Sequence, residues 1–299
     1  MSRESSPLEA EVVICARVIM GATILTRFPM KRLYCASGQS FSQRYFPLHR
    51  RSPAVRVAPR PALSAAVLAL GRDTTREREM RALVIGASGG IGSAVSRLLQ
   101  SKGWEVKGLS RSVEGFDVGD ATSVERCLVL QTEPFDLIFV AVGILAPPWS
   151  APEKALPAIK PDDMARVFAV NTIGPTLILR HAARLLPKGK RAVIAILSAR
   201  VGSIGDNNIG GWYSYRASKA ALNQIVHGAA IELRRSHKQS ICVSLHPGTV
   251  ETPFTRHYAG RHRTVPAAVA AANLLGVIEE LTPEQSGGFY DYAGQEIAW

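Results

Sequence analysis

The sequence predicts an α/β fold in which helices cover both faces of a parallel sheet. From Arg81 onward, short β-branched runs alternate with longer segments of helical period. Several runs, such as ALVIG and AVIAIL, are almost wholly apolar, which is typical of strands buried on both sides. Hydrophobic residues make up 46% of the 299 residues, and this amount of apolar material excludes disorder over the full length. We expect a single domain over residues 81–299.

The predicted elements follow one another in the order expected of repeated βαβ units. The β-branched and apolar runs predict strands at 81–86, 105–110, 136–142, 191–198, 241–246 and near 287–291. The intervening segments of helical period predict helices at about 90–102, 121–129, 161–187, 212–236 and 265–280. The chain shows no internal repeat, so these elements are expected to form one sheet.

The positive charge of the chain is concentrated near its N-terminus. Residues 12–72 contain ten Lys or Arg and no Asp or Glu, whereas residues 73–299 contain 25 basic and 21 acidic side chains. An Arg- and Ser-rich segment without acids is typical of an organelle-targeting presequence, and Arg outnumbers Ser, which favours a mitochondrion over a chloroplast. We therefore predict a presequence or disordered basic extension over residues 1–75. If the extension does not act as a presequence, we expect a cytoplasmic protein.

The sequence gives little support for a membrane protein, a metalloprotein or a nucleic-acid-binding protein. No apolar run approaches the roughly 20 residues of a membrane-spanning helix, so stable membrane insertion is not expected. The four cysteines form no CxxC pair and no histidines are spaced for zinc, so we predict no metal. The small charge excess of residues 73–299 gives no reason to expect a nucleic-acid partner. An RNA-associated organellar protein stays an alternative. It requires that residues 12–72 remain in the mature protein.

A glycine-rich turn follows the first predicted strand and opens the first predicted helix. Residues 86–92 read GASGGIG, with the spacing GxxxGxG. Glycines at such a turn let the backbone approach a pyrophosphate closely, and the N–H groups of the helix N-terminus bind it. The position of this turn predicts a Rossmann-type doubly wound sheet that binds a dinucleotide. The candidate binding residues are Gly86, Ser88, Gly90, Ile91 and Gly92.

Tyr215 and Lys219 form a candidate acid–base pair on the predicted helix 212–236. Residues four apart lie on one face of a helix, so the Lys219 ammonium can lie near the Tyr215 phenol. A tyrosine has an ordinary pKa of about 10, and a neighbouring cation favours its ionised form. We therefore expect Lys219, helped by an oxidised nicotinamide, to lower the pKa of Tyr215 toward the working range of a general acid or base.

With the glycine-rich turn, Asn171, Ser198 and the YxxxK pair in this order, residues 81–299 resemble the short-chain dehydrogenase/reductase family, and within it the C-factor-like branch. The resemblance implies that Ser198 binds the substrate carbonyl. It also implies that a main-chain distortion at Asn171 and a bound water link Lys219 to solvent as a proton relay. Ser203 is a rival to Ser198, because the family's usual spacing to the tyrosine is stretched here. The resemblance also implies coenzyme contacts by Asp117, Val118, Gly143, Pro247, Gly248, Val250 and Thr252, in addition to Tyr215 and Lys219.

The end of the second predicted strand bears on the choice of coenzyme. An acidic residue there holds the ribose 2′-hydroxyl of NAD, whereas an arginine can pair with the 2′-phosphate of NADP. Ser110 and Arg111 occupy this place. The sequence therefore predicts NADP(H). In two places the chain departs from the family: Ile85 replaces a customary threonine, and residues 140–143 read VAVG where the family has Asn-Asn-Ala-Gly.

Together these features predict an NADP(H)-dependent oxidoreductase that transfers hydride to or from a small carbonyl or alcohol substrate. The alternative is a catalytically idle coenzyme-binding signalling protein of the C-factor type. Relatives commonly pair through helices that correspond to 161–187 and 212–236, so a homodimer or homotetramer is possible. The loop 249–264 and the chain's end from residue 288 are expected to determine which substrate is bound.

Overall fold

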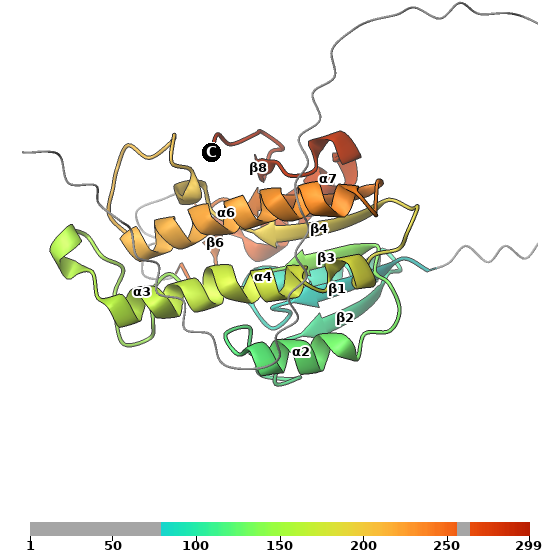
Figure 1. Cartoon of the computed structure of the whole chain (residues 1–299), viewed down its shortest axis with the longest axis horizontal. Helices are drawn as coiled ribbons and strands as arrows, with labels where there is room; N and C mark the ends of the chain where they lie inside the picture. Colours follow the sequence, from blue (N-terminus) through green and yellow to red (C-terminus); the bar gives the residue numbers. More distant parts are fainter. Residues whose placement is uncertain (1–78, 256–263) are drawn as a thin grey trace, which may run out of the picture. The chain divides into compact units, whose positions relative to one another are not determined.

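A parallel sheet with helices on both faces forms the part of the chain that the computed structural model describes, residues 79–255 and 264–299 (Figure 1). Six strands pair in the order β2-β1-β3-β4-β5-β8, and every pairing is parallel. This arrangement confirms the predicted Rossmann-type doubly wound sheet. The predicted presequence over residues 1–75 lies outside the described residues.

The strands of the main sheet are β1 (Arg81–Ile85), β2 (Glu105–Leu109), β3 (Leu137–Val140), β4 (Ala192–Leu197), β5 (Ser240–His246) and β8 (Phe289–Asp291). The α-helices are α1 (Gly90–Ser101), α2 (Ala121–Val129), α3 (Pro161–Phe168), α4 (Gly174–Leu179), α5 (Ala182–Leu185), α6 (Tyr213–Arg234) and α7 (Ala267–Glu280). Short helical turns occupy η1 (Leu156–Ala158), η2 (Ala169–Ile173), η3 (Arg200–Gly202) and η4 (Pro283–Gln285).

Two apolar clusters form the core, one on each face of the sheet. Residues of the first strand alternate between them: Leu83 and Ile85 face one cluster, and Ala82 and Val84 face the other. Helices α2, α4, α5 and α6 cover the first face, where Figure 1 shows α2, α4 and α6 side by side, and α1 and α7 cover the second. All four residues of β3 and all six of β4 are buried, which confirms the prediction from the apolar runs.

The order of the strands places a crevice at one edge of the sheet. Strand β1 pairs with β2 on one side and with β3 on the other, so the connections after β1 and after β2 lead the chain in opposite directions. In sheets of this kind a ligand binds outside the carboxyl ends of the strands at such a switch point. The glycine-rich turn follows β1 directly and therefore lies at this crevice.

The prediction of a single helix over residues 161–187 is wrong. The chain forms α3, then a π-helical segment over η2, then α4, and then α5, which ends at Leu185. Pro175 explains the irregular segment, because proline has no N–H to donate to the carbonyl of Asn171 four residues earlier, and its ring crowds that carbonyl. Asn171 therefore lies in a distorted stretch of main chain rather than in a regular helix.

A second, two-stranded sheet has no counterpart in the predicted elements. Strands β6 (Val250–Glu251) and β7 (Val265–Pro266) pair in parallel, with Val250 opposite Val265. Strands of two residues are too short to show a period in the sequence. This pair joins the two described segments on either side of residues 256–263.

Gly174 provides a test of how tightly the first face is packed. A Cβ atom built there would lie 2.3 Å from Cγ2 of Val118 and 2.6 Å from its carbonyl oxygen. We expect Gly174→Ala to lower the free energy of unfolding by about 1–3 kcal/mol, as overpacking does, measured by urea denaturation.

Gly228, an exposed residue within α6, is the matched control. A Cβ atom there meets nothing within 4 Å. Gly228→Ala should raise the free energy of unfolding by about 0.5–1 kcal/mol, because alanine is the better helix former. Equal stability of Gly174→Ala and the wild type would contradict the packing described here.

Candidate functional site

A cleft of about 480 Å³ lies at the carboxyl edge of the main sheet. Segments that follow five of the strands line it: residues 88–91 after β1, Arg111 after β2, 141–143 after β3, 198–199 after β4 and 247–248 after β5. Helix α6 contributes Tyr215 and Lys219. Of the predicted site residues the cleft contacts Ser88, Gly90, Ile91, Arg111, Gly143, Ser198, Tyr215, Lys219, Pro247, Gly248, Val250 and Thr252.

The glycine-rich turn has the shape that a phosphate cradle requires. Gly86 has a φ of 87°, and a Cβ atom on Gly92 would lie 2.2 Å from the Gly86 carbonyl oxygen, so the turn closes tightly on itself. The N-cap of α1 is Gly89, no side chain caps the helix, and its first turn holds no acidic residue. The N–H groups of this turn therefore point to a place that suits an anion.

Ser198 and Ser203 have different surroundings. The hydroxyl of Ser198 is buried, lines the cleft and has no hydrogen-bond partner among the described residues. The hydroxyl of Ser203, in contrast, accepts a hydrogen bond from the N–H of Asp206 at 3.0 Å, and Ser203 does not line the cleft. A buried polar atom without a partner is costly unless a ligand supplies one, so the geometry favours Ser198 as the ligand-binding serine.

Tyr215 lies in the first turn of α6, whose start is fixed by Glu153. The buried carboxylate of Glu153 accepts hydrogen bonds from the N–H and the hydroxyl of Ser214, and its main-chain carbonyl accepts one from the N–H of Trp212. Trp212 is the N-cap and has a left-handed φ of 51°, which is uncommon for a bulky residue. Its ring contacts the Tyr215 ring edge-on, with centroids 6.3 Å apart.

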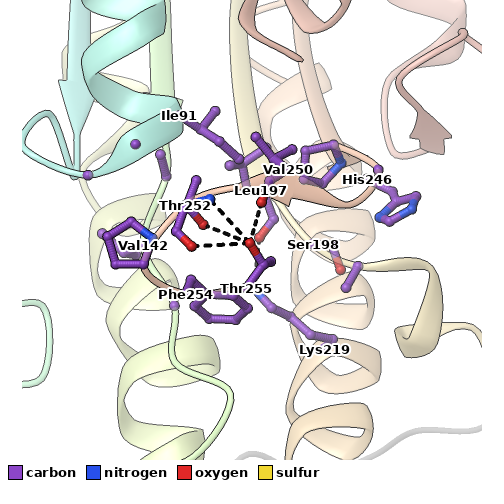
Figure 2. Close-up of a pocket in the computed structure, with 18 of the residues that line it drawn as sticks. Ile91, Val142, Leu197, Ser198, Lys219, His246, Val250, Thr252, Phe254 and Thr255 are labelled. Atoms are coloured by element: carbon purple, nitrogen blue, oxygen red, sulfur yellow. Dashed lines mark hydrogen bonds between the residues drawn. The ribbon is translucent and has the colours of Figure 1, made fainter. Parts of the chain in front are cut away.

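Lys219 is buried beside the end of β4. Its Nζ donates a hydrogen bond to the carbonyl of Leu197 at 2.8 Å and lies 6.0 Å from the centre of the Tyr215 ring. Gly202 covers it so closely that a Cβ atom there would lie 2.8 Å from the Lys219 Cβ. Figure 2 shows Lys219 on the same side of the cleft as Ser198.

Burial determines the ionisation of both members of the pair. It raises the pKa of Tyr215 above the ordinary value and lowers the pKa of Lys219 from 10.5 to about 7. The attraction of Lys219 by itself therefore does not lower the pKa of Tyr215. The expectation that Lys219 and an oxidised nicotinamide together lower it stays a prediction. Spacing along the helix placed the two side chains correctly, but desolvation outweighs the attraction between them, so the protein groups by themselves keep Tyr215 protonated.

Asn171 is buried within a network of hydrogen bonds beside the cleft. Its amide accepts from the N–H of Ile144 and donates to the Ile144 carbonyl, both at 2.8 Å, and donates to the Ser218 hydroxyl at 3.1 Å. A Cβ atom on Gly143 would lie 3.3 Å from Oδ1 of Asn171 and 3.5 Å from Nζ of Lys219. Gly143 therefore separates Asn171 from Lys219, and only a residue without a side chain leaves this space open.

Thr255 holds the loop that closes the cleft beyond β5. Its hydroxyl donates to the main-chain carbonyls of Val250 and Thr252, and it accepts from the N–H of Thr252 at 3.2 Å (Figure 2). Thr252 in turn faces the glycine-rich turn, because a Cβ atom on Gly90 would lie 2.5 Å from its Cγ2. The rest of the loop 249–264, from residue 256 to 263, lies outside the described residues.

The remaining predicted site residues contact other parts of the fold. Gly86 and Gly92 shape the turn, and Asn171 contacts neighbouring elements, as described above. Val118 is buried against Gly174, and the Asp117 carboxylate accepts a hydrogen bond from the N–H of Gly119. None of these five residues lines the cleft. Adenine contacts by Asp117 and Val118 stay a prediction.

Two further residues line the cleft: His246, which the sequence predicts as a strand-end residue, and Phe254, which the sequence places beside the site with packing as its favoured role. His246 ends β5, and burial, aided by the charge of Arg200, lowers its pKa to about 4, so it is neutral at pH 7. Its Nδ1 is buried without a partner among the described residues. Phe254 contacts the Tyr215 ring, with centroids 6.2 Å apart. The position of Phe254 beside the predicted site was the sequence signal for a pocket wall, whereas His246, next to Pro247, gave only the signal of a strand end.

Within residues 79–255 and 264–299, no group of three His, Cys, Asp or Glu could hold a metal ion. None of the helices in this part of the chain is long and apolar enough to span a membrane.

A doubly wound sheet, a glycine-rich turn at its switch point and a buried Tyr–Lys pair in one cleft define a dinucleotide-binding α/β protein. A family model described as enoyl-(acyl carrier protein) reductase matches residues 86–288. A 1-hydroxy-2-glutathionyl-2-methyl-3-butene dehydrogenase from Rhodococcus sp. (strain AD45) is 34% identical over 232 residues, which cover 73% of this chain and 98% of the relative. The chain belongs to the short-chain dehydrogenase/reductase family of oxidoreductases.

Other similar proteins agree with this assignment. C-signal from Myxococcus xanthus is 41% identical over 140 residues, which cover 46% of this chain and 79% of the relative. A short-chain dehydrogenase/reductase from Burkholderia multivorans with bound NADP has the same fold, with a TM-score of 0.64, 24% identity and coverage of 74% of this chain and 100% of that one. An NADPH-bound carbonyl reductase from chicken fatty liver has a TM-score of 0.63 and 25% identity over 74% of this chain and 95% of that one.

The lowered pKa of Lys219 predicts a dependence of stability on pH. Between about pH 7 and 10.5 the unfolded chain holds a proton on Lys219 that the folded chain has lost, so the free energy of unfolding rises with pH in this range. The slope from this one group is at most about 1.4 kcal/mol per pH unit. Lys219→Met removes this contribution, so urea denaturation at pH 7, 8 and 9 should show a smaller rise for the variant.

Lys190→Met is the control, because Lys190 is exposed and should leave the slope unchanged. If the free energy of unfolding depends on pH equally in the wild type and in Lys219→Met, burial does not lower the pKa of Lys219.

Proposed function

We propose that this chain is an NADP(H)-dependent oxidoreductase that transfers hydride between the nicotinamide and a carbonyl or alcohol substrate. The observation that carries the proposal is the convergence of Ser198, Tyr215 and Lys219 on the same cleft as the glycine-rich turn. The residues fit a dinucleotide, because the N–H groups of α1 are free of side-chain caps and a glycine at position 90 leaves room beside Thr252. The NADP-bound and NADPH-bound structures of similar fold support this coenzyme.

The coenzyme, when bound, supplies the hydride acceptor or donor, and the chain supplies orientation and the proton. The unpartnered hydroxyl of Ser198 donates a hydrogen bond to the substrate oxygen and holds the carbonyl in place. Tyr215, which burial keeps protonated, donates its proton to that oxygen in the reductive direction. A Lys219 amine with a pKa of about 7 can give or take a proton near neutral pH and so restore Tyr215.

Asn171 completes this site as a positioning residue. Its amide ties the segment after β3 to Ser218 in α6, and the Ser218 hydroxyl donates to the carbonyl of Tyr215 at 2.8 Å. The irregular main chain around Asn171, next to Lys219 and Gly143, is the route by which a proton relay to solvent would pass.

The remaining sequence expectations extend this proposal. Residues 1–75 act as a mitochondrial presequence, and the protein works in the organelle matrix as a homodimer or homotetramer. The acid-free stretch from residue 12 to 72 supports the targeting role. Sequencing the N-terminus of the mature protein tests it: a start near residue 75 is expected, and retention of residues 12–72 in the organelle would contradict it.

A second candidate function follows from the 41% identity to C-signal over 140 residues. In this alternative the chain binds a coenzyme and acts in signalling without turnover. The presence of Ser198, Tyr215 and Lys219 together in the cleft favours the enzyme, because a protein without turnover needs no acid–base pair there.

Tyr215→Phe tests the proposed reaction. Loss of the hydroxyl removes the proton donor, so turnover should fall by about 100-fold to 10,000-fold, the range typical of general acid–base catalysis. NADPH binding should stay nearly unchanged, because the ring keeps its contacts with Trp212 and Phe254. The measurement is NADPH oxidation against a panel of aldehydes, ketones and quinones, with binding followed by calorimetry. Wild-type turnover in the variant would contradict the role of Tyr215.

Arg111→Ala tests the proposed preference for NADP(H). Arg111 lines the cleft after β2, where its guanidinium can pair with a 2′-phosphate. The variant should bind NADPH about tenfold or more weakly, as loss of a charge-assisted hydrogen bond predicts, while NADH binding changes little. Equal binding of the two coenzymes by the wild type would rule out the preference.

A further inference from the structure

The carboxylate of Glu114 occupies the hydrogen-bond donors of Ser110. Its Oε2 accepts from the Ser110 N–H at 2.7 Å and from the Ser110 hydroxyl at 2.9 Å. Ser110 is buried, whereas Glu114 is exposed. One acidic oxygen from the following loop therefore takes both donors that Ser110 offers.

These two donors lie at the place where the coenzyme's ribose is expected. Ser110 directly follows β2, and the carbonyl of Leu109 accepts hydrogen bonds from Gly86 and Ala87 of the glycine-rich turn at 2.8 and 3.3 Å. Arg111, the next residue, lines the cleft. In doubly wound sheets the residue that ends this strand contacts the 2′ position of the adenine ribose.

A backbone N–H, a hydroxyl and a guanidinium together form a donor set that suits a phosphate. The Glu114 carboxylate is an anion that satisfies the first two of these donors. A 2′-phosphate and this carboxylate cannot share them, because both are negatively charged and each hydrogen can be donated to only one of the two acceptors at full strength.

We propose that Glu114 is an internal competitor for the 2′-phosphate of NADP(H) and sets the strength of coenzyme discrimination at Ser110. This inference rests on the proposed coenzyme site. For the phosphate to bind, the Glu114 side chain leaves Ser110, so the affinity for NADP(H) is lower than Ser110 and Arg111 would provide alone.

The loop itself does not have to move when the side chain leaves. The Ser110 carbonyl accepts main-chain hydrogen bonds from Glu114 at 3.2 Å and from Phe116 at 2.9 Å, and Phe116 is buried in the core. Because Glu114 is exposed, its side chain can rotate into solvent around fixed backbone. The exchange therefore costs two hydrogen bonds on the protein and no rearrangement of the fold.

The test is calorimetric binding of adenosine 2′,5′-bisphosphate and 5′-AMP, which differ by the 2′-phosphate alone, to the full chain. Glu114→Ala frees Ser110 and removes the charge, so adenosine 2′,5′-bisphosphate and NADPH should bind about tenfold more tightly. Glu114→Gln keeps an acceptor on Ser110 without the charge and should show a smaller gain. Binding of 5′-AMP and NADH should stay within about twofold of the wild type for both variants. These fold-changes follow from the typical strength of charged hydrogen bonds.

Glu280→Gln is the control, because it makes the same change in net charge at an exposed residue at the end of α7. It should alter none of these affinities. Unchanged or weaker binding of adenosine 2′,5′-bisphosphate by both Glu114 variants would overturn the proposal. Weaker binding of NADH and 5′-AMP by the variants would also overturn it, since Glu114 would then act as an acceptor for the ribose 2′-hydroxyl.

Failure of this inference is distinguishable from failure of the proposed coenzyme preference. If the wild type prefers the 2′-phosphorylated ligand and the Glu114 variants do not change that preference, only the competitor role is wrong. If neither the wild type nor any Glu114 variant prefers it, both proposals are wrong. A preference that first arises in Glu114→Ala would support the competitor role.

Discussion

The hydrogen bond from the buried Lys219 amine to the carbonyl of Leu197 connects the sheet to the helix that carries the proposed acid. This carbonyl belongs to the peptide that joins Leu197 to Ser198, so the same bond fixes the strand end that presents the Ser198 hydroxyl. Gly202 seals the contact by packing directly on Lys219. Strand β4, the turn after it and α6 are thereby held in one arrangement, and Ser198 and Tyr215 face one cleft.

The polar groups around the site divide according to whether they have partners. The amide of Asn171 and the hydroxyls of Thr172 and Ser218 all make hydrogen bonds, which tie the segment after β3 to α6. Such a satisfied buried network specifies one geometry. Ser198 Oγ and His246 Nδ1, both in residues that line the cleft, lack partners among the described residues. The groups that tie the segment after β3 to α6 are therefore satisfied, whereas Ser198 and His246 leave polar atoms where a ligand can meet them.

The two ends of the site use electrostatics differently. Near Tyr215, burial dominates and shifts the pKa values of Tyr215 and Lys219 in the directions that disfavour charge. Near Ser110, which is itself buried, the exposed Glu114 carries a carboxylate that binds donors that also suit a phosphate. Low dielectric thus governs the proton chemistry, while competition between anions governs the proposed coenzyme preference.

The sequence by itself determined the order of the elements, because apolar runs, helical periods and a glycine-rich turn are local features. All six predicted strands of the main sheet agree with the structure to within two residues. A single helix over 161–187 was predicted although Pro175 is visible in the sequence, since the period of the flanking residues continues across it, whereas the distorted main chain at Asn171 agrees with what the family resemblance implied. Only the tertiary structure decided which serine faces the cleft, that burial outweighs the Tyr–Lys attraction, and that Glu114 reaches Ser110. Each of these depends on how deeply a group is buried and on what lies beside it, and neither property is encoded in spacing along the chain.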